Sequence, residues 1–378
     1  MRGSLLRVLL CCTVALLGSC SPETPSIKIG VACPLTGDQA KIGQDMLNGA
    51  KLAVDEVNAA GGLLGLPVRL VALDDQHNPT QAVAAAHRFV SDPRVLAVVA
   101  HLNSACTMPA SDVYAAAGLV QVTPCSTNVD ITRRGLKTIF RMCAHDGTQG
   151  KAAARYAAST LKARRIFVLD DKTTYGQGLA GEFVKAAAGM GCTIVGRDSI
   201  NQGEMDFNAL LTVVKAKRPQ AIFFGGMYPQ GALIAKQARE LGVTAVLLGG
   251  DGLFDKTLIQ LAGPEAAEGV TATMVGVNMG TVASAREFVG RYEAAYGPIG
   301  PYSPYAYDAV RLVAAAIARA GKAERPAVLA AVRATKAWKG VTGVTTFDAA
   351  GDTLNQVISV YTVRKGEWTY QGLAWGKL

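Results

Sequence analysis

Short runs of apolar, mostly β-branched residues alternate along the chain with longer Ala-rich stretches whose apolar positions recur at helical spacing. Runs of the first kind indicate buried strands, and stretches of the second kind indicate helices that cover a sheet. The first part of the chain predicts strands at 27–31, 68–73, 95–100 and 119–123, with helices at 44–59, at 80–91 and up to residue 117. A strand followed by a helix is the repeating unit of a parallel sheet.

A second series of the same kind starts with a helix near residue 148. It predicts strands at 166–169, 193–197, 221–224 and 245–248, separated by helices at 178–188, 207–216 and 230–241. Further helices are expected near 283–296, 304–320 and 325–335, followed by β segments to the end. Repeated strand–helix units imply parallel sheets with helices on both faces, and a chain of 378 residues is long for a single core. We therefore predict an α/β chain of two similar Rossmann-like lobes with parallel sheets.

The first twenty residues, MRGSLLRVLLCCTVALLGSC, have the pattern of a targeting signal. Two arginines precede an apolar run at 8–17. This run is too short to span a bilayer but fits a secretory signal. The run ends in Leu-Gly-Ser-Cys, which resembles the lipobox of bacterial lipoproteins. This resemblance implies a signal peptide at 1–19, lipidation of Cys20, a lipidated tether at 20–26 and an extracytoplasmic, membrane-anchored location. An ordinary signal peptide that happens to end in a cysteine is the alternative.

The formal net charge of +9 includes Arg2 and Arg7 of the signal, so cleavage removes two charges and leaves +7. The remaining basic residues are scattered, with pairs such as Arg133–Arg134 and Arg164–Arg165 but no long run. A surface that binds nucleic acid needs a concentrated basic stripe with stacking aromatics, and aromatics make up only 6% of this chain. We interpret the charge as solvated surface and expect no nucleic-acid partner.

Five cysteines follow Cys20, and their odd number leaves at least one unpaired within the chain. They show neither a CxxC motif nor a Cys/His spacing typical of a metal site, so we expect no metal and interpret them as small buried residues. A disulfide between Cys106 and Cys125 stays open as an alternative, because both residues follow neighbouring predicted strands.

The segments directly after the predicted strands are rich in Gly, Ser, Thr, Asn and Asp. These segments are residues 33–37, 74–78, 101–107, 124–128, 170–178, 225–229 and 249–255. In parallel α/β sheets, ligands bind at the carboxyl ends of the strands and near helix N-termini. This composition indicates a small polar ligand held by hydroxyls and backbone N–H groups.

Ordered stretches at these same loops carry a family resemblance: PLTG (34–37), AVDEVNAAGGLLG (53–65), DDQHNPTQAV (74–83), HLNSACTMPASDVY (101–114), TPCSTN (123–128), FRMCAHDGTQG (140–150), DDKTTYGQGLA (170–180), FFGGMYP (223–229) and GGDG (249–252). They resemble the leucine/isoleucine/valine-type, or branched-chain, amino-acid-binding proteins of bacterial ABC importers, which have the periplasmic binding protein type I fold. The resemblance implies two lobes joined by three crossovers, near His145, Thr273 and Leu354. The first lobe would comprise 27–145 plus 274–353, and the second 146–273 plus 354–378.

The same resemblance implies how a ligand would be held. Ser104 and Thr127 would donate hydroxyl hydrogen bonds to its carboxylate, and Cys125 would contribute only its backbone. Ser104 also stands where a helix begins, so the helix dipole would favour the anion. Asp251, on the opposite lobe, would pair with an α-ammonium group through charge-assisted hydrogen bonds. Taken without the resemblance, Ser104 is an N-cap, Thr127 a turn residue and Asp251 a turn residue that caps the next helix.

Tyr175 would cover the ligand, and Ile42, Met227 and Tyr302 would form the wall around its side chain. Ile42 and Met227 stand where the family often carries aromatics, so the wall is apolar but its shape departs from the leucine-type pattern. His77 and Asn103 stand where the family commonly has a disulfide, which we therefore expect to be absent.

The implied function is capture of a small, neutral L-amino acid between closing lobes and its delivery to the permease subunits of an ABC importer. We expect a monomer without a cofactor and without enzymatic activity, because neither a G-x-S-x-G elbow nor an H-E-x-x-H motif occurs. A ligand sensor of the same fold is one alternative. A nucleotide-dependent enzyme is another, since residues 176–181 (GQGLAG) match G-x-G-x-x-G. That fingerprint should directly follow a strand, whereas residues 170–175 intervene here.

Overall fold

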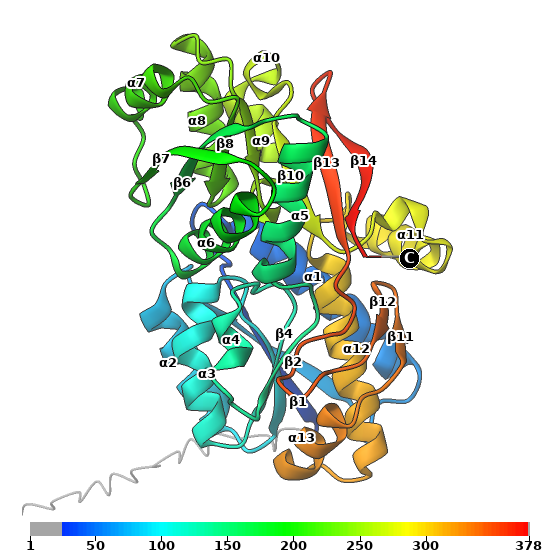
Figure 1. The fold of residues 1–378 in the computed structure, drawn as a ribbon. Helices are drawn as coiled ribbons and strands as arrows, with labels where there is room; N and C mark the ends of the chain where they lie inside the picture. The colour runs from blue at the N-terminus through cyan, green and yellow to red at the C-terminus, as the bar shows by residue number, and fades with distance from the viewer. Residues whose placement is uncertain (1–24, 377–378) are drawn as a thin grey trace, which may run out of the picture.

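The computed structural model describes residues 25–376. Over that range the chain forms two α/β lobes, drawn one above the other in Figure 1, each with its own sheet. The predicted signal peptide and Cys20 lie outside the described residues. Between residues 25 and 376, no helix is both long enough and apolar enough to cross a membrane.

The first lobe is built on a five-stranded sheet that is parallel throughout. Its strands, in spatial order, are β2 (Val68–Asp74), β1 (Ile27–Cys33), β3 (Val95–Ala100), β4 (Val120–Thr123) and β5 (Ile139–Arg141). Every residue of β3 is buried, and its alternate side chains enter two different cores, Val98 in one and Val99 in the other. Burial on both faces explains why this strand is an unbroken apolar run in the sequence.

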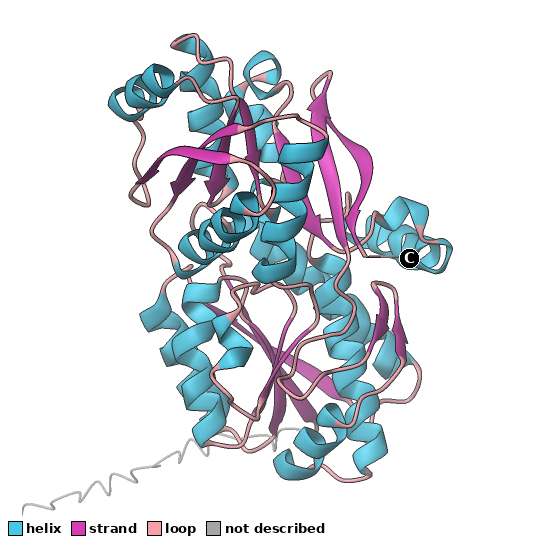
Figure 2. Cartoon of the chain, in the orientation of Figure 1, coloured by secondary structure: helices cyan, strands magenta, loops and turns pink. Residues whose placement is uncertain are grey.

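Helices flank this sheet (Figure 2). They are α1 (Ala40–Ala59), α2 (Pro79–Ser91), α3 (Ser104–Ala116), the short α4 (Asp130–Arg133) and, from later in the chain, α11 (Arg286–Tyr296), α12 (Ser303–Ala320) and α13 (Arg325–Arg333). Helix α1 packs against α12. Gly49 permits this close approach, because a Cβ atom there would collide with the carbonyl oxygen of Ser303. A small hairpin of β11 (Trp338–Gly340) and β12 (Gly343–Thr345) follows α13.

The second lobe contains a seven-stranded mixed sheet. Its strands, in spatial order, are β14 (Glu367–Trp375), β13 (Ile358–Arg364), β10 (Thr271–Val275), β9 (Val246–Gly249), β8 (Ala221–Gly225), β6 (Arg165–Asp170) and β7 (Thr193–Ser199). A parallel sheet was expected, and most of the strands are parallel, but β13 pairs antiparallel with both β10 and β14. Their two-residue turn, Lys365–Gly366, has positive φ angles of 52° and 77°, which suit a tight hairpin.

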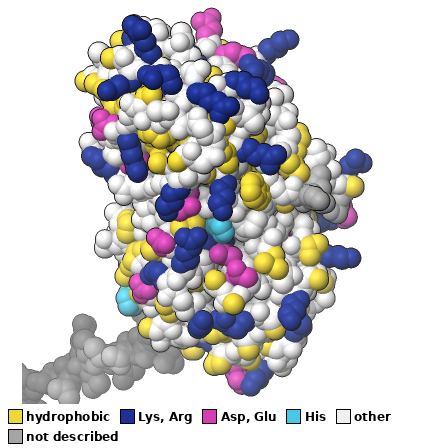
Figure 3. All heavy atoms as spheres, viewed as in Figure 1, with side chains coloured by type: hydrophobic (Ala, Val, Ile, Leu, Met, Phe, Trp, Pro, Cys, Tyr) yellow, Lys and Arg dark blue, Asp and Glu magenta, His cyan; other side chains and the backbone are white. Residues whose placement is uncertain are grey.

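The helices of the second lobe are α5 (Asp146–Ser159), α6 (Thr174–Ala188), α7 (Asn208–Lys217), α8 (Tyr228–Glu240), α9 (Lys256–Ala262) and α10 (Pro264–Ala267). Three short 3-10 turns complete the described elements: η1 (Asp251–Leu253), η2 (Met279–Thr281) and η3 (Ala283–Ala285). On the face drawn in Figure 3, lysines and arginines are spread over both lobes and form no stripe. This distribution agrees with a solvated basic surface.

The chain passes between the two sheets three times. The first passage runs from β5 to α5, the second follows β10, and the third precedes β13. The boundary expected near Thr273 falls inside β10, because all of that strand pairs within the second sheet and the chain leaves it only after Val275. These passages place the carboxyl ends of the strands of both lobes around one shared gap.

A fully buried arginine ties two of the connecting segments together. The Arg141 guanidinium forms an ion pair with Asp352 at 2.7 Å, next to the third passage. It also donates to the carbonyl oxygens of Ser126 and Asn128, at 3.2 and 2.6 Å, and to the Thr132 hydroxyl at 2.8 Å. Arg141 therefore fixes the loop after β4, which contains two of the predicted site residues.

We expect Arg141→Met to lower the free energy of unfolding by about 3–5 kcal/mol, because it leaves a carboxylate and several carbonyls without their donor. Arg134→Met is the control, since Arg134 pairs with Asp112 on the surface and should cost less than about 1 kcal/mol. Urea denaturation of the two variants measures the difference. Equal midpoints would contradict the role given to Arg141.

Candidate ligand-binding site

A small, narrow cavity of about 20 Å³ lies between the two lobes. Ten residues line it: Leu102, Asn103, Ser104, Cys125, Thr127, Tyr175, Met227, Asp251, Gly252 and Tyr302. Seven of the eight residues expected from the sequence are among them, the exception being Ile42. The cavity thus brings together side chains that are far apart in the sequence.

The topology explains much of this convergence, because most of the expected residues follow the carboxyl end of a strand, whereas Tyr302 lies between α11 and α12. Ser104 begins α3 directly after β3, and Thr127 lies in the loop after β4. Across the gap, Tyr175 is in the first turn of α6, Met227 precedes α8, and Asp251 begins η1 after β9. In parallel sheets these strand ends share one edge, which is where ligands bind.

Hydroxyls and a helix N-terminus make up the wall of the first lobe. Ser104 is buried at the start of α3, and its hydroxyl oxygen accepts a hydrogen bond of 3.3 Å from the backbone amide of Asn128. The Thr127 hydroxyl is buried and lies near the carboxyl of Asp146, where it partly offsets the raised pKa of that acid. The first amides of a helix lack intrahelical acceptors, and their dipoles favour an anion. This wall is suited to a carboxylate.

A buried carboxylate faces it from the second lobe. Asp251 is 3% exposed and accepts hydrogen bonds from the hydroxyls of Tyr175 at 2.9 Å and Tyr302 at 2.6 Å. Burial raises the pKa of Asp251 above its usual value, and the hydrogen bonds from these tyrosines partly offset that shift. Tyr302 is the N-cap residue of α12, and α12 packs on the first lobe, so the bond from the Tyr302 hydroxyl crosses the gap. The site therefore has one acidic pole opposite one pole that attracts anions.

A second buried acid was not predicted. Asp146 is the first residue of α5, is fully buried, and neither of its carboxyl oxygens has a hydrogen-bond partner among the described residues. Burial, followed by the negative charge of Asp251, raises the pKa of Asp146 well above its usual value. Such a carboxyl is favoured in its protonated form. Asp146 lies within the matched stretch FRMCAHDGTQG, but nothing in the sequence distinguishes it from a helix-capping acid.

The remaining wall is apolar. Met227 and Leu102 line the cavity, and Gly252 lets the chain pass close to the ring of Tyr175, because a Cβ atom there would lie 3.0 Å from that ring. Ile42 is buried in the core instead, since it starts the apolar stripe of α1 that continues with Met46. Leu102, which was not expected, contributes to the apolar wall.

The cysteines among the described residues are all buried and free, so the Cys106–Cys125 bridge is not formed. The Cys125 thiol lies 3.7 Å from the sulfur of Met46, and burial raises the pKa of this thiol well above the usual value. His77 and Asn103 are joined through the side chain of Gln39 and not by a disulfide. Residues 25–376 contain no cluster of three ligating side chains that could hold a metal.

The competing chemistry has no geometric support. Gly176 and Gly178 lie inside α6, not at the end of a strand, so the glycine pattern forms no phosphate loop. His101 is fully buried and paired with Asp75 at 2.8 Å, and His145 caps α5 by accepting from the Thr148 amide. Both histidines therefore have structural partners within the first half of the chain.

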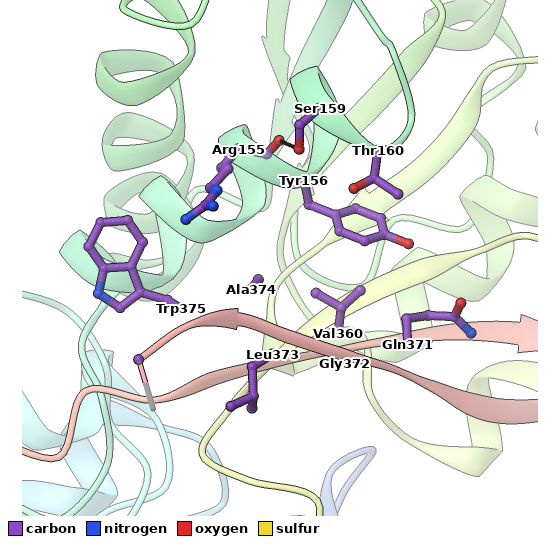
Figure 4. Close-up of a pocket in the computed structure, with 11 residues that line it drawn as sticks. Arg155, Tyr156, Ser159, Thr160, Val360, Gln371, Gly372, Leu373, Ala374 and Trp375 are labelled. Carbon is purple, nitrogen blue, oxygen red and sulfur yellow. Dashed lines mark hydrogen bonds between the residues drawn. The ribbon is translucent and has the colours of Figure 1, made fainter. Parts of the chain in front are cut away.

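A separate groove lies between α5 and the edge strand β14 (Figure 4). Its labelled lining includes Arg155, Tyr156 and Trp375, and the expected site residues lie elsewhere. It lacks the paired poles found in the cavity between the lobes.

Comparison with known proteins gives the context for this geometry. A family model described as periplasmic binding protein matches residues 26–367. The chain is 40% identical to an amino acid binding protein of Pseudomonas aeruginosa, over 68% of this chain and 70% of that protein. It is 39% identical to a Leu/Ile/Val-binding protein of Rhizobium johnstonii, over 71% and 72% of the two chains.

Among solved structures, the fold is similar to a branched-chain amino acid transporter substrate-binding protein of Streptococcus pneumoniae in complex with isoleucine. The TM-score is 0.86 at 30% identity, covering 92% of this chain and 99% of that chain. Fold, family model and relatives agree, and these relatives are binding proteins, not enzymes. The chain belongs to the periplasmic binding protein family.

Proposed function

We propose that this protein is an extracytoplasmic, lipid-anchored receptor for a small, neutral, branched-chain-type L-amino acid, which it delivers to the permease of an ABC importer. The observation that carries the proposal is the pairing of a buried carboxylate with a hydroxyl-lined helix N-terminus across one cavity. Relatives at about 40% identity that are named for amino acids, and in one case for Leu, Ile and Val, support it.

The two poles match the two charges of an amino acid. Asp251 accepts the α-ammonium group, and the hydroxyls of Ser104 and Thr127, with the backbone at Cys125, hold the carboxylate. Charge-assisted hydrogen bonds are strong in a closed site from which water is excluded. Leu102 and Met227 then contact an apolar side chain, which favours aliphatic over charged amino acids.

Delivery requires that the ligand favours the closed shape. Contacts that both lobes make with one molecule provide such a preference, since an open form would keep only half of them. Shifting a two-state equilibrium from 1:99 to 99:1 takes about 5.5 kcal/mol of differential binding. Because the open form keeps the contacts with one lobe, the charged contact with the other lobe, worth roughly 1.5–3 kcal/mol, supplies up to about half of that difference, and the apolar contacts and the hydrogen bonds between the lobes supply the rest. A membrane partner can then recognise the loaded, closed protein.

We expect Asp251→Asn to weaken binding of L-leucine, L-isoleucine or L-valine by about 30-fold or more, because loss of one partner of a buried charged pair costs roughly 2 kcal/mol or more. Asp146→Asn is the matched control, since Asp146 is buried nearby but does not line the cavity. Isothermal titration calorimetry on both variants measures the affinities. Unchanged affinity in Asp251→Asn, or an equal loss in both, would remove the ammonium assignment.

The control also makes a prediction about stability. The pKa of Asp146 is raised in the folded state, so its contribution to stability is fully present below about pH 4 and is lost as the pH rises towards neutrality. Asp146→Asn mimics the protonated form and should therefore raise Tm relative to the unmodified protein at pH 7.5, with a gap that narrows on acidification. Differential scanning calorimetry between pH 4 and 8 measures this gap; a gap that widens towards low pH would be the wrong sign.

The lipid anchor is tested separately. Cys20→Ser should abolish incorporation of labelled palmitate and release the protein from the membrane fraction, because the thioether acceptor is gone. Cys12→Ser, within the apolar part of the signal, keeps Cys20 and should behave like the unmodified protein. Labelling that survives in Cys20→Ser would refute lipidation at this residue.

A further inference from the structure

Four side chains form a hydrogen-bonded chain from the cavity to the opposite lobe. The Asn103 amide donates to Gln39 Oε1 at 2.8 Å, and the Gln39 amide nitrogen lies 2.7 Å from His77 Nδ1. The other ring nitrogen of His77 lies 3.3 Å from the side-chain amide of Gln202. The first three residues belong to the first lobe, and Gln202 follows β7 of the second. The chain is therefore complete only when the lobes are together.

We propose that His77 is a positioning residue that latches the closed form and couples closure to the cavity through Gln39 and Asn103. This inference rests on the proposed capture of an amino acid between closing lobes. It adds a residue outside the cavity to the machinery that retains the ligand.

The cavity end of the chain is prepared for such a role. Asn103 lines the cavity, is 8% exposed, and its Oδ1 atom is buried without a hydrogen-bond partner among the described residues. Although Asn103 is the N-cap of α3, its side chain makes no capping bond. Its amide instead donates to Gln39, which leaves Oδ1 free for a donor such as an ammonium group or a bound water. An occupied cavity thus fixes Asn103 and, through it, Gln39.

The middle of the chain is rigid. Gln39 is 1% exposed and stands at the start of α1. His77 lies in a turn after β2 in the left-handed region, with φ of 55°, and its amide donates to the Asp75 carboxylate at 3.1 Å. A neutral imidazole has one donor and one acceptor, so His77 accepts from the Gln39 amide nitrogen at Nδ1 and, with the exposed Gln202 amide turned so that its oxygen faces the ring, donates from Nε2. The ring can thereby bridge the two glutamines without a net charge.

The latch acts beside other bonds that cross the gap. The Tyr228 hydroxyl donates at 2.6 Å to the carbonyl oxygen of Asp38, the residue before Gln39. The side-chain amide of Asn128 donates to the carbonyl oxygen of Thr174 at 2.7 Å. Those bonds end on backbone oxygens. The His77–Gln202 contact joins two side chains, and Gln202 is exposed, so it can be removed without disturbing a core.

The test is stopped-flow measurement of L-leucine, L-isoleucine and L-valine binding to Gln202→Ala, His77→Ala and the double variant. Loss of the latch should speed ligand release about 3- to 10-fold and leave the association rate unchanged, because the bond forms only after the ligand has entered. Gln202→Ala should keep the ligand-free Tm. The double variant should release no faster than either single variant, since both remove the same contact. His77→Gln, which keeps a donor and an acceptor, should restore part of the retention.

Gln44→Ala is the matched control, because Gln44 is an exposed glutamine of α1 that bonds only to Asn48 within its own helix. Its release rate should equal that of the unmodified protein. Unchanged release in Gln202→Ala, or additive effects in the double variant, would overturn the latch while the capture function stands. If the unmodified protein binds none of these amino acids, the proposed function fails, and the latch as a ligand-retention device fails with it.

Discussion

The structure depends on a carboxylate kept out of water between two lobes. Asp251 has two tyrosine hydroxyls as partners and no cation, and a buried carboxylate without a countercharge costs several kcal/mol. One of the two hydroxyls, from Tyr302, comes from the other lobe. Closing the gap thus both removes Asp251 from water and supplies part of its compensation. In the proposed function, the ammonium group of the ligand supplies the rest, which would tie the closed form to a ligand.

The folding pattern makes that arrangement possible. Parallel strands bring all their following loops to one edge, and three passages of the chain turn the two edges towards each other. The positions of these loops depend on buried polar side chains such as Arg141, which donates hydrogen bonds to the carbonyl oxygens on both sides of Thr127. Binding groups on rigid strand ends, joined by short connections, can approach and separate as two bodies without rearranging either core.

Most of the fold could be predicted from the sequence. Strands that are buried on both faces produce unbroken apolar runs, and helices that cover a sheet produce Ala-rich stretches with apolar positions at helical spacing. The predicted helices and strands are present with ends shifted by a few residues. Elements without a predicted counterpart are short: β5 spans three residues and α9 seven, too few for a periodic signal. Ile42 is absent from the lining of the cavity, and a sequence pattern does not tell which face of α1 meets a cavity and which meets the core. Asp146 gave no signal at all, since burial without partners is a property of three-dimensional packing.

Asp146 also limits what the site can hold. Burial raises the pKa of both carboxyls, and the negative charge of Asp251 raises that of Asp146 further, so the site disfavours two negative charges together. In the proposed function, one ammonium group pairs with Asp251 while the ligand carboxylate is met by the start of α3. A second positive group on the ligand would require Asp146 to lose its proton in a dry environment, beside an apolar wall formed by Leu102 and Met227. In the proposed function, the charges of the site, and not only its shape, would therefore favour amino acids with neutral side chains.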